Sequence, residues 1–210
     1  MTLQQPLAEL LRPQQLGDLT LPQRDIDRLQ RMVDAGQIMG MVFHGSPGLG
    51  KTSAARIIIQ AVAGESGMEI NGSSLTGIDS VRERIEPFAR SGSLFGGNKI
   101  CLIDEADYLS KHAQASLRHV IENSWSTCRF LFTVNDVGKL VPAIQSRLTL
   151  VCFDIAPTDR DQVLRQLRAR YRSRLAELGI KYDEASLDQI IGVYFGDFRK
   201  IAQQVEWEFT

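Results

Sequence analysis

The 210-residue chain has no long apolar run, and its charges nearly balance, with a formal net charge of −1. Because it lacks a stretch of about 18 uncharged apolar residues, we expect no membrane-spanning helix. The opening segment MTLQQPLAELLRPQQ has no basic stretch followed by an apolar one, so we expect no secretory signal. This charge argues against a protein that is basic all over, yet it allows a basic stripe that contacts nucleic acid.

Cysteine is scarce in this chain, and only Cys101, Cys128 and Cys152 occur. Each lies in or beside an apolar run, which is typical of buried thiols. None of the spacings is C-x-x-C, and this disfavours a zinc site. We therefore expect reduced, mostly buried cysteines in a cytoplasmic protein.

Strand and helix patterns alternate over the first 155 residues. Short runs of β-forming residues predict strands at 41–44, 68–70, 100–103, 129–134 and 149–153. Helical patterns lie between them at 51–63, 78–90 and 112–123, and Pro87 is a candidate kink in the second. This alternation predicts an α/β fold, a parallel sheet with helices on both faces.

After residue 153 the strand signals stop and helical patterns follow. Thr158 and Asp161 have the spacing of an N-cap and its capping box. One apolar helix face then comprises Leu164, Leu167, Tyr171, Leu175 and Leu178, and two more helical patterns cover 184–194 and 198–208. We therefore expect an α/β domain over residues 1–155 and a small all-helical lid domain over residues 156–210.

The segment HGSPGLGKT, residues 44–52, fits the phosphate-loop pattern G-x-x-x-x-G-K-[ST] between a predicted strand and a predicted helix. Glycines let backbone N–H groups turn toward a phosphate, and the helix N-terminus adds its positive end. Lys51 is expected to reach the β- and γ-phosphates and Thr52 to bind Mg²⁺. The predicted nucleotide-binding residues of this loop are Gly45, Ser46, Pro47, Gly48, Leu49, Gly50, Lys51, Thr52 and Ser53.

An acidic pair follows the third predicted strand, at Asp104 and Glu105 in the letters D-E-A-D. Carboxyl ends of parallel strands are where α/β sheets bind ligands, so Asp104 is expected to hold Mg²⁺ together with Thr52. Glu105 is expected to orient or deprotonate the attacking water. A DEAD-box helicase needs two such domains, and this chain has a single phosphate loop.

With these motifs in place, the chain resembles AAA+ ATPases of the sliding-clamp loader family, such as the small subunits of replication factor C and the ATPase subunits of tailed-phage clamp loaders. The run Gly-Ile-Asp-Ser-Val-Arg at 77–82 is similar to one that clamp loaders carry. The resemblance implies a P-loop ATPase that uses ATP and Mg²⁺ in DNA replication. It extends along nearly the whole chain.

The resemblance also implies roles for residues around the nucleotide. Arg12 and Pro13 would border the adenine, in an element where Leu11 replaces the usual Tyr. Asn135, at the end of Thr-Val-Asn, would be the first sensor of the γ-phosphate or the lytic water. Arg199, in Gly-Asp-Phe-Arg-Lys, would be the second sensor, bonding the γ-phosphate from the lid.

Other residues would connect subunits and DNA. Arg147, in Gln-Ser-Arg-Leu, would act in trans as an arginine finger on the neighbouring subunit's ATP. Arg82 and Arg84 would contact the DNA backbone. Gln114 and Arg118, which by pattern alone look like solvated helix residues, would couple DNA binding to catalysis.

The expected partners are primed or duplex DNA, a sliding clamp, and other clamp-loader subunits or further copies of this chain. Clamp loaders carry a third, collar domain, and we expect it to be absent because this chain ends with the second-sensor helix. Either the collar was removed from a longer protein or the chain is a natural compact version. Full activity is expected to need subunit association. One alternative is a nucleotide-binding adaptor that docks on a clamp or clamp loader without loading activity; another is a branch-migration motor, which the run at 77–82 disfavours.

Two segments keep open interpretations. Residues 91–97 are either a clamp-facing loop that presents Leu94 and Phe95 or a flexible connection. The first lid helix and its approach carry many arginines, most of them expected to face solvent, where a polyanion or subunit contact is an alternative: Arg160, Arg165, Arg168, Arg170, Arg172 and Arg174.

Overall fold

A parallel five-stranded sheet forms the centre of the computed structural model, which describes residues 5–75, 77–92 and 99–210. The strand order is β2-β3-β4-β1-β5, and neighbouring strands run parallel. The strands are β1 Met41–His44, β2 Gly67–Asn71, β3 Lys99–Asp104, β4 Cys128–Val134 and β5 Thr149–Cys152. The predicted α/β class is confirmed, and every predicted strand overlaps an observed one.

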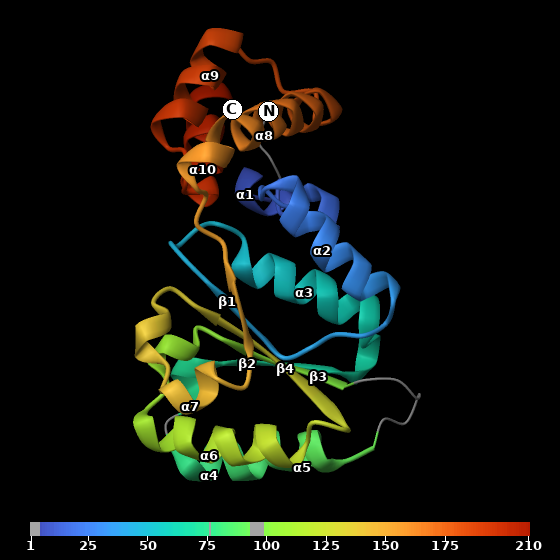
Figure 1. Ribbon diagram of the computed structural model, residues 1–210. Helices are drawn as coiled ribbons and strands as arrows, with labels where there is room; N and C mark the ends of the chain where they lie inside the picture. Colours follow the sequence, from blue (N-terminus) through green and yellow to red (C-terminus); the bar gives the residue numbers. More distant parts are fainter. Residues whose placement is uncertain (1–4, 76, 93–98) are drawn as a thin grey trace.

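Helices cover both faces of the sheet (Figure 1). Along β1, Met41 and Phe43 pack toward α2 Gln23–Asp34 and α3 Lys51–Val62, whereas Val42 packs toward the opposite face. On that opposite face lie α4 Ile78–Ser80, α5 Glu86–Arg90 and α6 Lys111–Asn123. The central strands are therefore buried on both sides, which is why their sequences read as apolar runs and not as alternating patterns.

The helix around Pro87, the candidate kink, is irregular. The segment Val81–Ile85, directly before it, forms a π-helical stretch between α4 and α5. Proline has no N–H to donate, and its ring clashes with the carbonyl one turn earlier. A wider turn before Pro87 moves that carbonyl away, so the helix widens locally and continues to Arg90.

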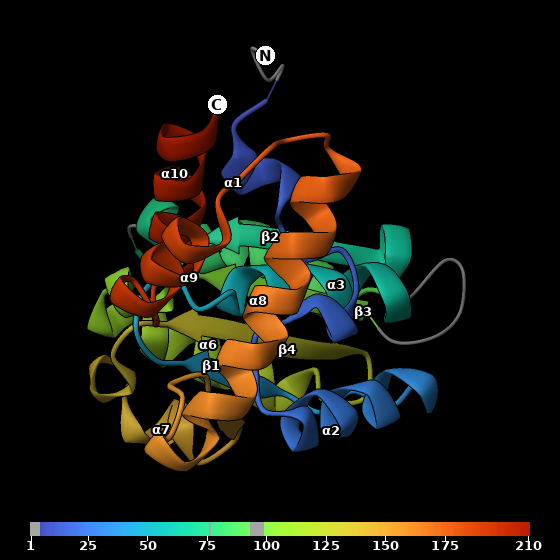
Figure 2. The same ribbon diagram turned by 90° about the horizontal axis from the view of Figure 1, so that it is seen from above.

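The C-terminal region is helical, and it contains α8 Arg160–Glu177, α9 Glu184–Val193 and α10 Phe198–Phe209. Its hydrophobic core also receives Leu7 and Leu11, from or next to the short helix α1 Leu7–Leu10. Figure 2 shows α1 beside α8 and α10, above the sheet layers. The start of the chain thus packs on the helical region, although the two are far apart in sequence.

Most arginines of the first lid helix were expected to face solvent, but two on α8 bond backbone carbonyls. Arg170 is partly buried and donates to the backbone carbonyls of Asp18 and, at 2.5 Å, Leu11. Arg174 donates to the carbonyl of Leu10 at 3.0 Å. These two side chains therefore attach the N-terminal segment to α8.

The predicted cap of the first lid helix is wrong. Thr158 lies within a 3₁₀ turn, Pro157–Asp159, and α8 begins at Arg160. Asp159 occupies the N-cap position, but its carboxylate makes no capping bond because Arg24 of α2 donates to its two oxygens at 2.7 and 2.6 Å. For the Asp159 carboxylate, the pair with Arg24, 135 residues earlier, therefore takes the place of a local capping bond.

Two of the three cysteines are buried as expected, and Cys152 is exposed. Cys152 lies on β5, an edge strand, where alternate side chains point outward. Burial raises the pKa of Cys128 to about 12, which keeps this thiol protonated and unreactive. No helix in the described part of the chain has both the length and the apolar character that crossing a membrane requires.

Candidate nucleotide-binding site

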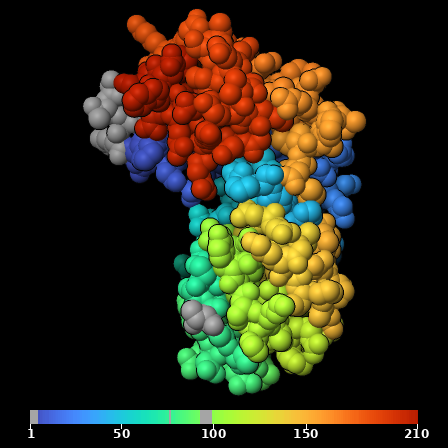
Figure 3. Space-filling model, turned by 90° about the vertical axis from the view of Figure 1, so that its left-hand side faces the viewer, coloured from blue at the N-terminus to red at the C-terminus, as the bar shows by residue number. Residues whose placement is uncertain are grey.

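A cavity of about 510 Å³ lies between the carboxyl edge of the sheet and the helical region. Figure 3 shows the molecule as two lobes, with the red and orange helices above and the layers around the sheet below. Four regions line the cavity: the phosphate loop, the ends of β3 and β4, the N-terminal segment 6–20, and α8 with α10. The cavity is therefore built from parts of the chain that are far apart in sequence.

The phosphate loop connects β1 to α3 as its sequence predicts. Gly50 has φ 87°, a left-handed conformation that favours glycine, and α3 begins at the next residue. Gly48 has φ 81°, and a Cβ there would collide with the carboxylate of Asp197 at the start of α10. Glycine is thus needed both for the turn and for the close approach of the helical region.

Lys51 is buried at the base of this loop, with only 7% of its surface exposed. Its Nζ donates to the carbonyls of Gly45 at 2.7 Å and Ser46 at 2.8 Å, and to Oδ1 of Asn135 at 2.9 Å. Burial lowers the pKa of Lys51, and the nearby Asp154 carboxylate opposes that shift. The structure thus brings together two predicted site residues, Lys51 and Asn135.

Asp104 is the centre of a hydroxyl–carboxylate network. Its Oδ1 accepts bonds from Oγ1 of Thr52 at 2.7 Å and Oγ1 of Thr133 at 2.5 Å. The Thr133 hydroxyl in turn accepts the backbone N–H of Glu105 at 2.9 Å. Mg²⁺ prefers carboxylate and hydroxyl oxygens, so the adjacent oxygens of Thr52 and Asp104 fit this ion.

Thr133 was not predicted as a site residue. Its signal in the sequence is weak, because a threonine inside a strand is ordinary β-forming material. Its position next to Asp104 follows from the adjacency of β3 and β4.

Glu105 is held in a left-handed conformation, with φ 55°, and it is the only non-glycine residue with positive φ in the described ranges. Its Oε2 accepts a bond from Nδ2 of Asn71 at 3.2 Å. Asn71 ends β2, opposite Asp104 in the strand register. A backbone conformation this rare marks a site where the side chain must point in a particular direction.

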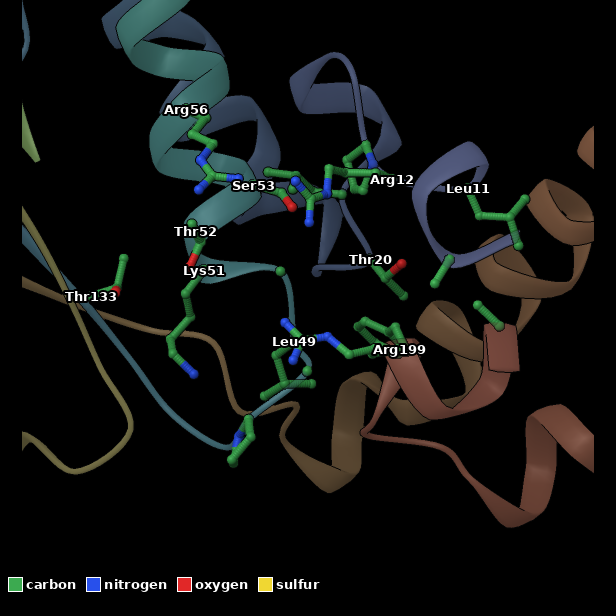
Figure 4. Close-up of a pocket in the computed structure, with 18 of the residues that line it drawn as sticks. Leu11, Arg12, Thr20, Leu49, Lys51, Thr52, Ser53, Arg56, Thr133 and Arg199 are labelled. Carbon is green, nitrogen blue, oxygen red and sulfur yellow. The ribbon is translucent and has the colours of Figure 1, made fainter. Parts of the chain in front are cut away.

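The opposite side of the cavity comes from the N-terminal segment and the helical region. Figure 4 shows Lys51 and Thr52 on the sheet side, facing Leu11, Arg12 and Arg199 across the cavity. Pro13 also lines the cavity, and Arg12 pairs with Glu9 at 2.9 Å.

A backbone bond joins α10 to the phosphate loop, from the N–H of Phe198 to the carbonyl of Gly48 at 3.3 Å. A second attachment was not predicted. The Oδ1 of Asp154 accepts the N–H of Ser46 at 2.8 Å, so the segment after β5 also holds the phosphate loop. Burial alone would raise the pKa of Asp154, but the bond from Ser46 and the Lys51 charge hold this pKa below its ordinary value. The loop is thus attached both to α10 and to the segment leading into α8.

The predicted DNA-contacting, coupling and trans-acting residues lie outside this cavity. Arg82 and Arg84 are exposed on the π-helical segment. Arg147 follows α7 Pro142–Gln145 and pairs with Glu122 of α6. Arg118, on α6, is partly buried and lies 3.9 Å from the same carboxylate.

Gln114 also lies outside the cavity, and it is not a solvated residue, because only 2% of it is exposed. Its amide donates to the carbonyls of Lys139 at 3.0 Å and Leu109 at 3.3 Å, and it accepts the N–H of Val141 at 2.7 Å. The helix α6 is thus bonded to the loop after β4. Leu94 and Phe95, the candidate clamp-facing pair, fall outside the described residues.

Comparison with known proteins agrees with this geometry. Residues 41–153 match the family described as "ATPase family associated with various cellular activities (AAA)". The chain is 36% identical over 203 residues to replication factor C subunit 3 of Oryza sativa subsp. japonica, covering 93% of this chain and 55% of the relative. It is 39% identical over 197 residues to the replication factor C small subunit of Methanoculleus marisnigri, covering 91% and 59%. The chain thus spans little more than half the length of these relatives.

A solved structure shares the fold. The RuvB Holliday junction branch migration motor of Thermotoga maritima superposes with a TM-score of 0.71 over 93% of this chain and 64% of that chain, at 18% identity. At this identity the likeness concerns the fold alone. The family match covers more than half of the chain and includes the phosphate loop and the acidic pair, so the chain belongs to the AAA family of ATPases.

Proposed function

We propose that this chain is the ATP-hydrolysing module of a sliding-clamp loader, which couples its nucleotide state to binding of DNA and a clamp. The observation that carries this proposal is the convergence of Lys51, the Thr52–Asp104 pair, Glu105 and Arg199 around one cavity. Similarity to replication factor C small subunits over more than 90% of the chain supports the choice of a clamp loader among AAA functions. In this proposal, residues 1–155 and 156–210 form two domains that move relative to each other.

In this proposal the triphosphate of ATP lies along the phosphate loop. Lys51, already directed at the loop, would exchange its bonds to the Gly45 and Ser46 carbonyls for phosphate oxygens. Thr52 and Asp104 would hold Mg²⁺, whose contribution is to offset charge on the phosphate oxygens. Arg12 and Pro13 would border the base at the other end of the cavity.

Glu105 would orient the attacking water. Its backbone N–H is fixed by Thr133, while its carboxylate is bonded to Asn71. Because Asn71 holds one oxygen of this carboxylate, release from Asn71 would be part of activation. Asn135 would contact the water or the γ-phosphate from beside Lys51.

The helical region would sense the nucleotide through α10. Arg199 lines the cavity from its first turn, next to the backbone bond between Phe198 and Gly48. A γ-phosphate bonded by Arg199 would pull α10 toward the loop, and its loss on hydrolysis would release it. Nucleotide state would thereby set the angle between the two domains.

DNA would be sensed on the far side of the sheet, by Arg82 and Arg84. Gln114 joins α6 to the loop after β4, and Arg118 lies one turn further along α6. The loop ends near Arg147, the proposed finger that would act on ATP in a neighbouring subunit. The proposed partners are therefore primed or duplex DNA, a sliding clamp, and other loader subunits or further copies of this chain.

ATP turnover per chain, measured against protein concentration with primed DNA present, tests this function. We expect turnover to rise steeply with concentration, because Arg147 would complete the site of another subunit. Lys51→Ala should abolish turnover and weaken nucleotide binding at least tenfold, since bonds to charged groups contribute about 1.5–3 kcal/mol each. Retained nucleotide binding without turnover at any concentration would favour the non-loading adaptor instead.

A further inference from the structure

Gln114, Arg118 and Glu122 recur every four residues along α6, and the first and last of them bond the loop between β4 and β5. Gln114 bonds the loop at Lys139 and Val141, and Glu122 pairs with Arg147 at its other end. Residues four apart share one face of a helix, so this face follows the whole loop. Figure 1 shows α6 and α7 as neighbours, and the two helices are in contact.

Within the described part of the chain, Arg147 bonds three residues. Its guanidinium donates to the carbonyl of Ala143 at 2.6 Å and to Oγ of Ser146 at 3.3 Å, and it pairs with Glu122. The donors of a guanidinium match carboxylate and phosphate alike. Glu122 therefore occupies donors that a phosphate would need.

Glu122 has a second arginine and a histidine nearby. Arg118 Nε lies 3.9 Å from its Oε1, and His119 Nδ1 lies 3.9 Å from its Oε2. The Arg118 Nε is buried, and no described residue gives it a hydrogen-bond partner. If Arg147 leaves, Arg118 can close on the carboxylate, so neither group is left unpaired.

We propose that Glu122 sequesters Arg147 within the single chain, and that subunit assembly lets the guanidinium exchange this carboxylate for a phosphate of the neighbouring nucleotide. The inference rests on the proposed trans role of Arg147. Glu122 then acts as a latch on Arg147: it raises the protein concentration that is needed before one subunit completes the site of another. The side chains of Arg147 and Glu122 are each about one-third exposed, so their ion pair is weak enough to break on assembly.

The first test uses the single chain without nucleotide. Phenylglyoxal modifies free guanidinium groups, and mass spectrometry of peptides gives the rate at Arg147. Glu122→Gln should raise this rate about two- to fivefold, the range expected for a partly exposed ion pair, while Glu65→Gln, which removes an exposed carboxylate elsewhere, should not. Equal rates in the two variants would overturn sequestration.

The second test measures ATP turnover against concentration. Glu122→Gln should lower the half-maximal concentration about two- to fivefold and leave the plateau unchanged. A lowered plateau would overturn the latch, because Glu122 would then be positioning Arg147 for catalysis. Arg147→Ala separates the two proposals: if it keeps the parent's turnover, the trans finger fails and the exchange with it, whatever the phenylglyoxal rates show.

Discussion

Thr133 uses both capacities of one hydroxyl group inside the candidate site. It donates to the carboxylate of Asp104 and accepts the backbone N–H of Glu105, so it links the side chain of one acidic residue to the backbone of the other. With only 2% of its surface exposed, it has no access to water as a substitute partner. The direction of Glu105 therefore depends on a residue of the neighbouring strand as well as on its own left-handed backbone.

Thr133→Val removes this hydroxyl and keeps the shape of the side chain. We expect the free energy of unfolding to fall by roughly 1–3 kcal/mol, because the Glu105 N–H is left without a partner. We also expect slower ATP turnover with little change in nucleotide affinity. Urea denaturation and steady-state kinetics measure the two effects. Thr133→Ser restores the hydroxyl and should recover both, and a Val variant that matches Ser would contradict this role.

At the scale of elements, a side-chain contact joins α2 to the N-terminal end of α8. Arg24 and Asp159 connect the two helices through paired hydrogen bonds, and Asp159 is only 5% exposed. The side-chain hydrogen bond from Arg24, followed by its charge, lowers the pKa of Asp159. The contact therefore fixes the entrance to the helical region and makes its stability depend on pH.

Asp159→Asn should lower the melting temperature at pH 7 relative to the parent. Because the pKa of Asp159 is lower in the folded chain, its stabilisation is present above the unfolded value of about 4 and is lost as pH falls through the folded value. The difference between variant and parent should therefore shrink below about pH 4. Asp161→Asn, at an exposed position two residues later, is the control. A difference that is constant from pH 7 to pH 3 would rule out the ion pair as its cause.

At the scale of the whole molecule, three hydrophobic clusters define the architecture. Two lie on the faces of the sheet, and the third joins the C-terminal helices to Leu7 and Leu11. The N-terminal segment therefore bridges the cavity, because it packs on α8 and continues into the layer over the sheet. This segment is therefore attached both to the helical region and to the layer over the sheet.

Arg170→Met tests this attachment. The carbonyls of Leu11 and Asp18 would lose a charged donor, worth about 1.5–3 kcal/mol, so amide hydrogen exchange over residues 7–20 should accelerate roughly 10- to 150-fold. Arg165→Met changes an exposed arginine of the same helix and should leave exchange unchanged. Similar exchange in both variants would mean that the hydrophobic contacts alone hold the segment.

The sequence by itself determined the features that depend on contiguous residues. Apolar runs predicted all five strands, and the glycine pattern of 45–52 with its strand and helix predicted the phosphate loop, because backbone conformation there depends on neighbours within a few positions. The acidic pair was recognisable because it follows a buried strand.

Only the tertiary structure decided which distant residues meet these features. Thr133 and Asn71 reach the acidic pair because β4 and β2 flank β3, and strand order is not written in any local pattern. Gln114 by pattern alone looks like a solvated residue, and a loop 25 residues later buries it. Thr158 is not the N-cap of α8, because it lies inside a 3₁₀ turn, and the N-cap residue Asp159 is paired with Arg24. Each of these outcomes follows from non-local packing, in which a side chain bonds whatever partner the fold brings within reach.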